Sequence, residues 1–224
     1  MRSDESVFEL PIYGLTDAAR YLRLPYQTLR YWTRGRGTVE PMVRLADAET
    51  PRLSFVNLME CHMLSAMRTH YDIHLPKVRR ALQTLRNIFP SSCHPLIEHP
   101  LETDAVNLFI RENGEIINLN RAGQLGFKDL LEMHLRRIAR NPDGTIAFFP
   151  FVEKRAADEP KIIMMNPAIS FGRPVITGTA IPTALIASRF HARESIGALA
   201  KEYGRTDKEI EEAIRWESRT ALAA

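Results

Sequence analysis

The chain is poor in the features that mark membrane and secreted proteins. Its 224 residues include only two cysteines, Cys61 and Cys93, which are too few for a disulfide framework and typical of a reducing compartment. No segment approaches the ~18 consecutive apolar residues of a membrane-spanning helix. The N-terminus carries Asp4, Glu5 and Glu9 and lacks the continuous apolar run of a signal peptide. We therefore expect a cytoplasmic protein without a membrane segment.

The sequence also lacks the short motifs of common enzyme classes. It has no glycine-rich phosphate loop, no G-x-S-x-G elbow, no H-E-x-x-H pair and no C-x-x-C pair. Its acidic residues are scattered along the expected helix faces, whereas a metal-dependent nuclease needs them grouped. We therefore predict that the protein is not an enzyme and has no catalytic residue, metal or cofactor.

The net charge is small, but its distribution is uneven. The chain carries a formal +3, whereas residues 20–44 hold six arginines and one acidic residue, Glu40. A basic segment on a nearly neutral chain is the electrostatic signature of a nucleic-acid contact. A solvated, arginine-rich face without a ligand is the alternative.

Composition and hydrophobic periodicity divide the chain into three blocks, residues 1–90, 91–157 and 158–224. The first predicts helices over 17–23, 26–33, 54–71 and 75–89, with a small hairpin or wing over 36–52. The second predicts two strands within 105–118, a helix over 127–140, a strand over 145–152 and a charged linker over 153–161. The third predicts a strand at 162–165, a loop rich in glycine and proline, and helices over 183–191, 195–203 and 207–219.

These elements predict a mainly α (α+β) fold. A winged helix-turn-helix domain is expected at the N-terminus and a domain of three helices at the C-terminus. A small mixed α/β segment, with a role in scaffolding or dimerisation, is expected between them.

The first two helices have the spacing of a helix-turn-helix. Ala19 and Leu22 of the first can pack on Leu29 and Trp32 of the second, which leaves polar side chains on the remaining surface of the second helix. Arginine and glutamine read guanine and adenine edges, while threonine and tyrosine hydroxyls serve phosphates. The predicted DNA-binding residues are Tyr26, Gln27, Thr28, Arg30, Tyr31 and Arg34, with Arg36 and Arg44 from the wing. A helical hairpin used for protein contact is the alternative.

The run Thr28-Leu29-Arg30-Tyr31-Trp32, followed by the wing, a helix and residues 75–79, resembles the MerR-type winged helix. The resemblance implies a recognition helix at residues 26–33, in which Thr28, Arg30 and Tyr31 match positions that commonly contact DNA. The long dimerising coiled coil of that family is absent. The apolar seam from Leu75 to Phe89 is short and could equally be ordinary core.

The C-terminal block resembles a second family. Residues 166–182 (NPAISFGRPVITGTAIP), with residues 194–196 and 211–215, are similar to the domain-of-unknown-function family numbered 433, found in short antitoxins encoded beside PIN-like ribonuclease toxins. Both ends together resemble larger VapB-type antitoxins that carry an N-terminal DNA-binding domain. Two positions depart from the family, since Ala180 replaces the arginine of its G-T-R-I run and Arg193 replaces a glycine.

This resemblance implies an antitoxin that represses its own operon as a homodimer on operator DNA and inhibits a PIN-type ribonuclease toxin. A basic side chain would enter the metal-binding acids of the toxin. The candidate toxin-binding residues are Arg173 first, then Pro174, Gly178, Thr179 and Arg189. These residues could instead only shape the turn before the helices. A MerR-type transcription factor that senses a small ligand is the alternative function, and a protein-only adaptor is the third.

Overall fold

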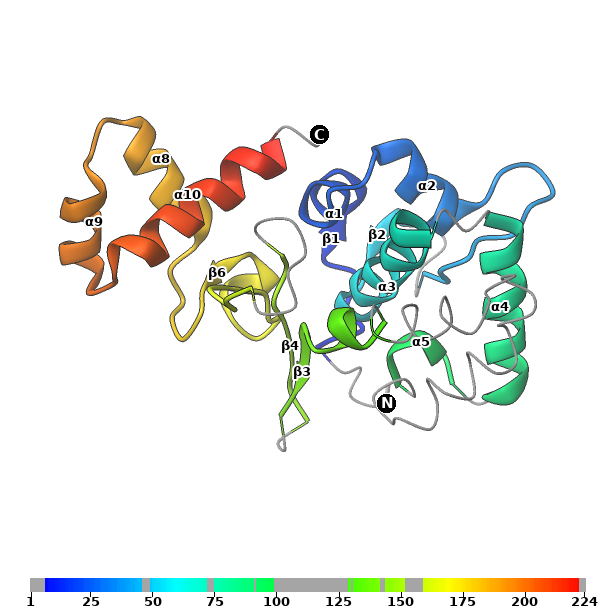
Figure 1. The fold of residues 1–224 in the computed structure, drawn as a ribbon. Coiled ribbons are helices and arrows are strands. Elements are labelled where there is room, and N and C mark those ends of the chain that lie inside the picture. The colour runs from blue at the N-terminus through cyan, green and yellow to red at the C-terminus, as the bar shows by residue number, and fades with distance from the viewer. Residues whose placement is uncertain are drawn as a thin grey trace, which may run out of the picture.

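The computed structural model describes residues 7–45, 49–71, 75–90, 92–98, 129, 131–141, 144–151 and 159–221. In these ranges the chain is mostly helical, with three small two-stranded sheets. One group of helices comes from the N-terminal block and another from the C-terminal block (Figure 1). The strands of the first sheet lie among the N-terminal helices, and those of the other two sheets lie between the two groups. The expected mainly α fold with some β structure is confirmed, whereas the strands expected within 105–118 lie outside the described residues.

The N-terminal block begins with the expected pair of short helices. Helices α1 (Leu15–Leu22) and α2 (Tyr26–Arg34) are joined by Arg23, in the left-handed conformation with φ 53°, and by Pro25 before α2. Leu29 and Trp32 are buried against the first helix, as the spacing predicted. Strand β1 (Tyr13–Gly14) precedes α1 and pairs antiparallel with β2 (Arg52–Leu53).

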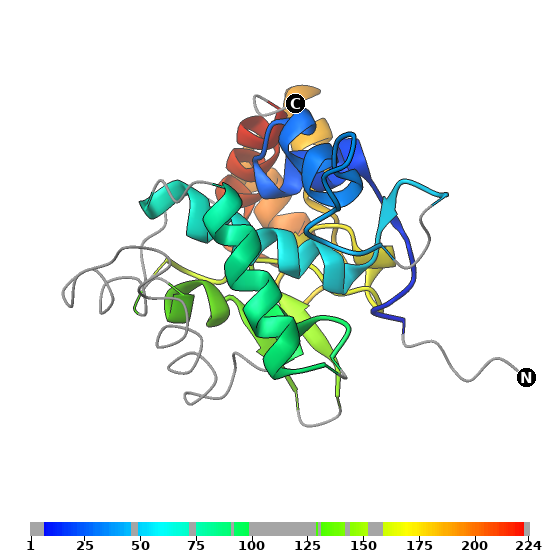
Figure 2. The same cartoon turned by 90° about the vertical axis from the view of Figure 1, so that its right-hand side faces the viewer.

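Two longer helices form the centre of this block. A reciprocal cap starts α3 (Phe55–Tyr71): the Asn57 amide donates to Ser54 Oγ at 3.1 Å, and the Ser54 amide donates to Asn57 Oδ1 at 3.2 Å. Helix α4 (Leu75–Ile88) crosses α3 (Figure 2) and buries the middle of its apolar seam. The seam is therefore core, and the short helix α5 (Pro95–Glu98) packs against both. None of the described helices is long and apolar enough to cross a membrane.

The expected wing differs from a regular hairpin. A tight turn joins Arg36 to Val39 by a single β-bridge, and the amides of Met42 and Val43 then both donate to the Trp32 carbonyl, at 2.8 and 3.0 Å. Gly35 permits this turn, because a Cβ there would lie 2.0 Å from the Val39 carbonyl oxygen. Among the described residues of 36–52 no further strand pairing follows this turn; β2 pairs with β1, which precedes the helices.

The prediction of a helix over 127–140 is wrong at its C-terminal end. The described helical residues end at Leu135, and β3 (Ile138–Arg140) pairs antiparallel with β4 (Ile146–Phe148). The buried Arg137 explains the break. Its guanidinium donates to the carbonyls of Phe149, Pro150 and Glu159, at 2.7, 3.1 and 2.6 Å, which draws two separate segments around it. The described end of the expected linker is thus anchored at Glu159.

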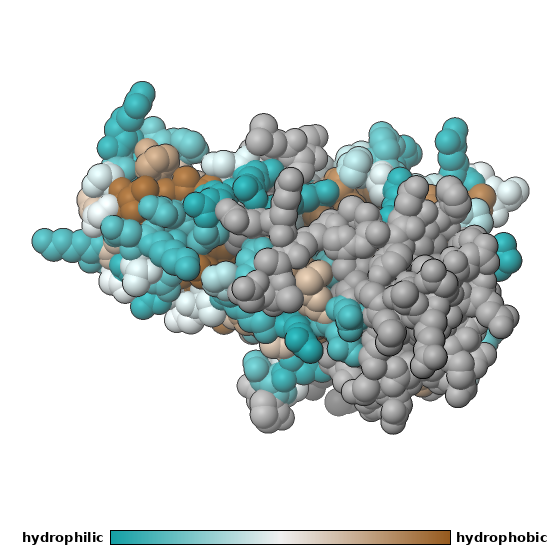
Figure 3. All heavy atoms as spheres, in the orientation of Figure 1, coloured by the Kyte–Doolittle hydropathy of each residue, from teal (hydrophilic) through white to brown (hydrophobic). Residues whose placement is uncertain are grey.

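The C-terminal block contains the three expected helices. Strands β5 (Ile163–Met164) and β6 (Val175–Ile176) flank the turn η1 (Ser170–Gly172), and helices α8 (Thr183–His191), α9 (Ile196–Tyr203) and α10 (Asp207–Ala221) follow. Helix α10 contacts both of the others and buries Trp216. Apolar side chains are visible on the surface over α8 and α9 (Figure 3).

Candidate nucleic-acid interface and C-terminal loop

The exposed face of α2 is a polar stripe. Gln27, Arg30 and Arg34 are exposed at helical spacing, while Leu29 and Trp32 on the opposite face are buried. Since a face at this spacing runs along one side of the helix, the stripe carries two guanidinium groups and one amide on that side of α2. Those are the groups that hydrogen-bond to guanine and adenine edges.

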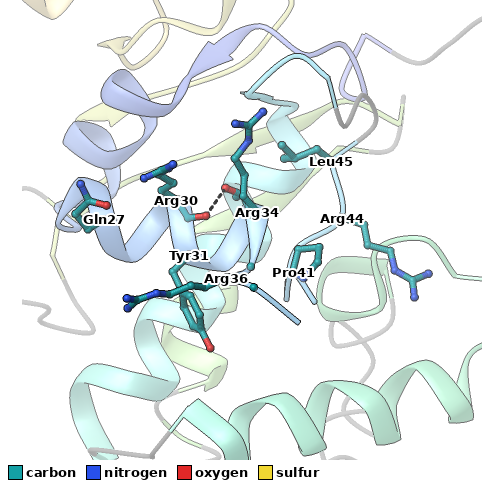
Figure 4. A pocket seen from close by; sticks show the side chains of 11 residues that line it. Gln27, Arg30, Tyr31, Arg34, Arg36, Pro41, Arg44 and Leu45 are labelled. Carbon is teal, nitrogen blue, oxygen red and sulfur yellow. Dashed lines mark hydrogen bonds between the residues drawn. The ribbon is translucent and has the colours of Figure 1, made fainter. Parts of the chain in front are cut away.

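A cleft of about 1160 Å³ lies beside this stripe (Figure 4). The described residues of its lining include four arginines and no acidic side chain: Arg30 and Arg34 come from α2, and Arg36 and Arg44 come from the segment that follows it. Their guanidinium groups fan out in different directions. Arginine is always charged and presents a fork of donors that fits phosphate, so the cleft suits a polyanion.

Helix α4 supports the far wall of the cleft. Arg79 donates to the Glu40 carbonyl, and its second nitrogen lies 3.4 Å from Tyr31 Oη. Arg86 donates to the Met42 carbonyl at 2.6 Å, and burial lowers its pKa. These bonds fix the turn that carries Arg36. The positioning role of α4 was missed from the sequence, because nothing in its periodicity indicates what its arginines contact.

The structure thus brings together six of the eight predicted DNA-binding residues in one cleft: Gln27, Arg30, Tyr31, Arg34, Arg36 and Arg44. Tyr26 and Thr28 lie in the first turn of α2, outside the lining of the cleft. Tyr26 is 40% exposed, and Thr28 is half-buried.

The C-terminal domain docks on the other side of the helix-turn-helix. Arg20 of α1 pairs with Glu217 of α10 at 3.3 Å, and the Arg23 guanidinium lies 5.2 Å from the centre of the Trp216 ring. Figure 1 shows α1 between α10 and α2. The contact therefore leaves the exposed stripe of α2 open.

The loop before α8 contains four of the five predicted toxin-binding residues, and the fifth, Arg189, lies in α8. Arg173 is exposed and forms no ion pair among the described residues, whereas Pro174 is buried and its carbonyl accepts from the Thr183 amide at 3.0 Å. Arg173 also borders a cavity of about 310 Å³ between this loop and α1. In the next turn Gly178 is exposed, and the Thr179 hydroxyl donates to the Ile176 carbonyl at 2.7 Å.

Arg189 is partly exposed, and its guanidinium is paired with neighbouring residues of the C-terminal helices. Its guanidinium lies 2.5 Å from Glu202 and from Glu194 carboxylate oxygens, and it donates to Tyr203 Oη at 2.8 Å. Hydrogen bonds to Glu202, Glu194 and Tyr203 raise the pKa of Arg189. This network ties α8 to α9, so Arg173 is the more accessible of the two predicted arginines.

An ionic cluster joins Glu9 and the buried Glu60 of the N-terminal block to the buried His94, which follows that block. His94 Nδ1 lies 2.9 Å from Glu60 Oε2, and His94 Nε2 lies 3.2 Å from Glu9 Oε2. Burial lowers the pKa of His94, but hydrogen bonds and charge from both carboxylates outweigh it and raise the value to about 10. Burial raises the pKa of Glu60, and the hydrogen bond to His94 opposes this. No sequence pattern indicates the cluster.

The fold and the cleft define a chain with a helix-turn-helix near its N-terminus and a group of three helices near its C-terminus. Residues 11–82 match the family described as "Putative DNA-binding HTH domain". Residues 163–216 match the family described as "Protein of unknown function (DUF433)". The resemblance of the C-terminal block to the family numbered 433 is confirmed, and so is the expected helix-turn-helix domain at the N-terminus.

Relatives that align along nearly the whole chain occur in Mycobacterium tuberculosis. The chain is 26% identical to "Putative antitoxin VapB45", over 92% of this chain and 94% of that protein. It is also 26% identical to "Uncharacterized protein Rv2308", over 100% of this chain and 98% of that protein. The X-ray crystal structure of Rv2018 from the same organism has a TM-score of 0.70 at 23% identity, covering 93% of this chain and 99% of that one, and supports the fold.

Proposed function

We propose that this chain is the antitoxin of a type II toxin–antitoxin system, which neutralises a PIN-type ribonuclease toxin and represses its own operon by binding operator DNA. The arginine-lined cleft beside α2 carries the DNA-binding half of the proposal. The full-length similarity to a protein named as an antitoxin supports the other half. In this proposal the chain regulates and does not catalyse.

The operator is bound by α2 and the segment after it. The major groove admits one helix, and residues of the exposed stripe then reach base edges. Arg30 and Gln27 read bases, while Arg36 and Arg44 contact phosphates on either side. The chain acts as a homodimer, so that two copies of α2 read half-sites one helical turn apart.

The toxin is bound by the loop before α8. PIN-type ribonucleases hold metal ions with clustered acids, and a guanidinium forms charge-assisted, bidentate hydrogen bonds with carboxylates. Arg173 is exposed and forms no ion pair within the described residues, so it is the arginine that enters the acidic site. Arg189 contributes by fixing α8 and α9 behind the loop.

A crossed pair of variants tests both halves. DNA binding is measured by the fluorescence anisotropy of a labelled duplex from upstream of the gene. Neutralisation is measured by how far the chain suppresses RNA cleavage by the product of the adjacent gene. Arg30→Ala should lose DNA affinity and still suppress cleavage, whereas Arg173→Ala should keep DNA affinity and lose suppression.

Two outcomes would contradict the proposal. Equal DNA affinity in wild type and a folded Arg30→Ala would reject α2 as the reader. DNA binding without any effect on the adjacent gene product would favour the alternative, a ligand-sensing transcription factor of the MerR type.

A further inference from the structure

The loop before α8 displays an aromatic ring to solvent. Phe171 is 84% exposed, compared with 43% for Leu185 and 40% for Tyr26, the next most exposed large apolar side chains among the described residues. Single exposed apolar residues are common and need no explanation by themselves. Phe171 differs because its backbone conformation is also unfavourable.

Three consecutive residues of this turn are left-handed. Ser170 has φ 48°, Phe171 has φ 55° and Gly172 has φ 73°. This conformation suits glycine, but it crowds the Cβ of any other residue, and an aromatic residue is a poor choice for it. Such strain persists only where surrounding contacts enforce it, and it concentrates at functional sites.

The surrounding contacts enforce the turn. The Gly172 amide donates to the Ile169 carbonyl at 3.0 Å, and the Ser170 hydroxyl donates to the Ala180 carbonyl at 3.0 Å. Tyr13 Oη donates to the Gly172 carbonyl at 3.0 Å and fills the space in which a Cβ on Gly172 would lie. The Phe171 ring is therefore presented from a fixed backbone, and it covers little of this chain's own core.

The ring stands two residues from the exposed Arg173. Aromatic and arginine side chains dominate the binding energy of interfaces, and a backbone fixed in advance lowers the cost of binding. A second copy of this chain is a poor occupant, because a two-fold contact through this patch would bring two Arg173 side chains together. An acidic protein partner instead offers carboxylates that can pair with the Arg173 guanidinium.

We propose that Phe171 is the apolar anchor with which the chain binds its acidic protein partner, inserting into an apolar pocket whose rim of carboxylates receives Arg173. The inference rests on the proposed function, in which that partner is the toxin. It identifies a residue that the family resemblance did not indicate. It also assigns a reason for the strained turn.

Phe171→Gly in the full-length chain tests this assignment. Glycine relieves the left-handed strain, so the Tm should stay the same or rise, whereas loss of an anchor raises the Kd for the adjacent gene product by at least about 30-fold. Phe171→Leu should fall between wild type and glycine. Leu185→Ala, an exposed apolar change on α8, is the matched control and should leave both Kd and Tm nearly unchanged.

The outcomes separate this inference from the function on which it rests. A higher Kd with an unchanged or higher Tm supports Phe171 as the anchor. If wild type and Phe171→Gly bind the adjacent gene product with the same Kd, the anchor role is overturned and the proposed function is not. A clear fall in the Tm of Phe171→Gly also overturns the anchor role, because it would show that the ring stabilises the fold. Absence of any complex with the wild-type chain overturns the proposed function and this inference together.

Discussion

Replacing His94 by glutamine should destabilise the protein, because it removes the positive charge beside a buried carboxylate. Glu60 and His94 are 4% and 7% exposed, and the two side chains meet at 2.9 Å. Removing one member of a buried ion pair costs about 3–5 kcal/mol. We expect about 3 kcal/mol, the low end of that range, because the Asn57 side chain still donates to the same Glu60 oxygen at 3.3 Å.

The pH dependence gives the prediction its sharper form. The pKa of His94 is raised from its ordinary value of 6.5 to about 10. The stabilisation by the imidazolium charge is therefore fully present below pH 6.5 and is lost as pH rises through about 10. In His94→Gln the buried carboxylate of Glu60 has lost its positively charged partner. Protonation of this carboxylate at lower pH removes the unpaired buried charge and so reduces the destabilisation. The difference in unfolding free energy between wild type and variant should therefore be largest near neutral pH and shrink on both sides.

Urea unfolding at a series of pH values measures this difference. Glu60→Gln combined with His94→Gln is the matched control, because it removes the buried charge as well as its partner and should recover most of the lost stability. If His94→Gln were as stable as wild type at neutral pH, or its deficit did not change with pH, the ionic account of this cluster would be refuted.

Three further predictions concern the two proposed sites. Arg30→Ala should weaken binding to the upstream DNA by about 1–3 kcal/mol without changing the Tm, because the side chain is exposed in the cleft; anisotropy measures the change, and equal affinity would contradict the assignment. Gly172→Ala would place a Cβ 2.1 Å from Tyr13 Oη, so the Tm should fall clearly, and an unchanged Tm would show that this contact is dispensable. Arg189→Met should lower the Tm more in low salt than in high salt while DNA affinity stays the same; a loss of DNA affinity would contradict its role within the C-terminal domain.

Local patterns predicted the longer helices of the N-terminal and C-terminal blocks and the polar face of α2. The spacing of Leu29 and Trp32 fixes which side of α2 is buried, and this also determines that Gln27, Arg30 and Arg34 are exposed. The three C-terminal helices followed equally from the apolar period and from glycine at the end of α9. These features depend on residues a few positions apart along the chain, so they can be predicted from the local sequence pattern.

Features made by distant residues were not predictable in the same way. Arg137 ends the expected helix because its guanidinium binds carbonyls between 12 and 22 residues away along the chain. The Glu60–His94 pair joins residues 34 apart. The exposure of Phe171 likewise depends on Tyr13, which fixes the turn from the other end of the chain. Such contacts depend on tertiary structure, which hydrophobic periodicity does not specify.

The central claim is that one chain binds DNA through α2 and a protein partner through the loop before α8. The most direct test is the mass of complexes, measured by light scattering after size exclusion, for the full-length chain with the adjacent gene product and the upstream duplex. The proposal predicts a single species that contains all three components and loses only the DNA in Arg30→Ala. Absence of the protein partner from the DNA-bound species, or displacement of one ligand by the other through a shared surface, would contradict it.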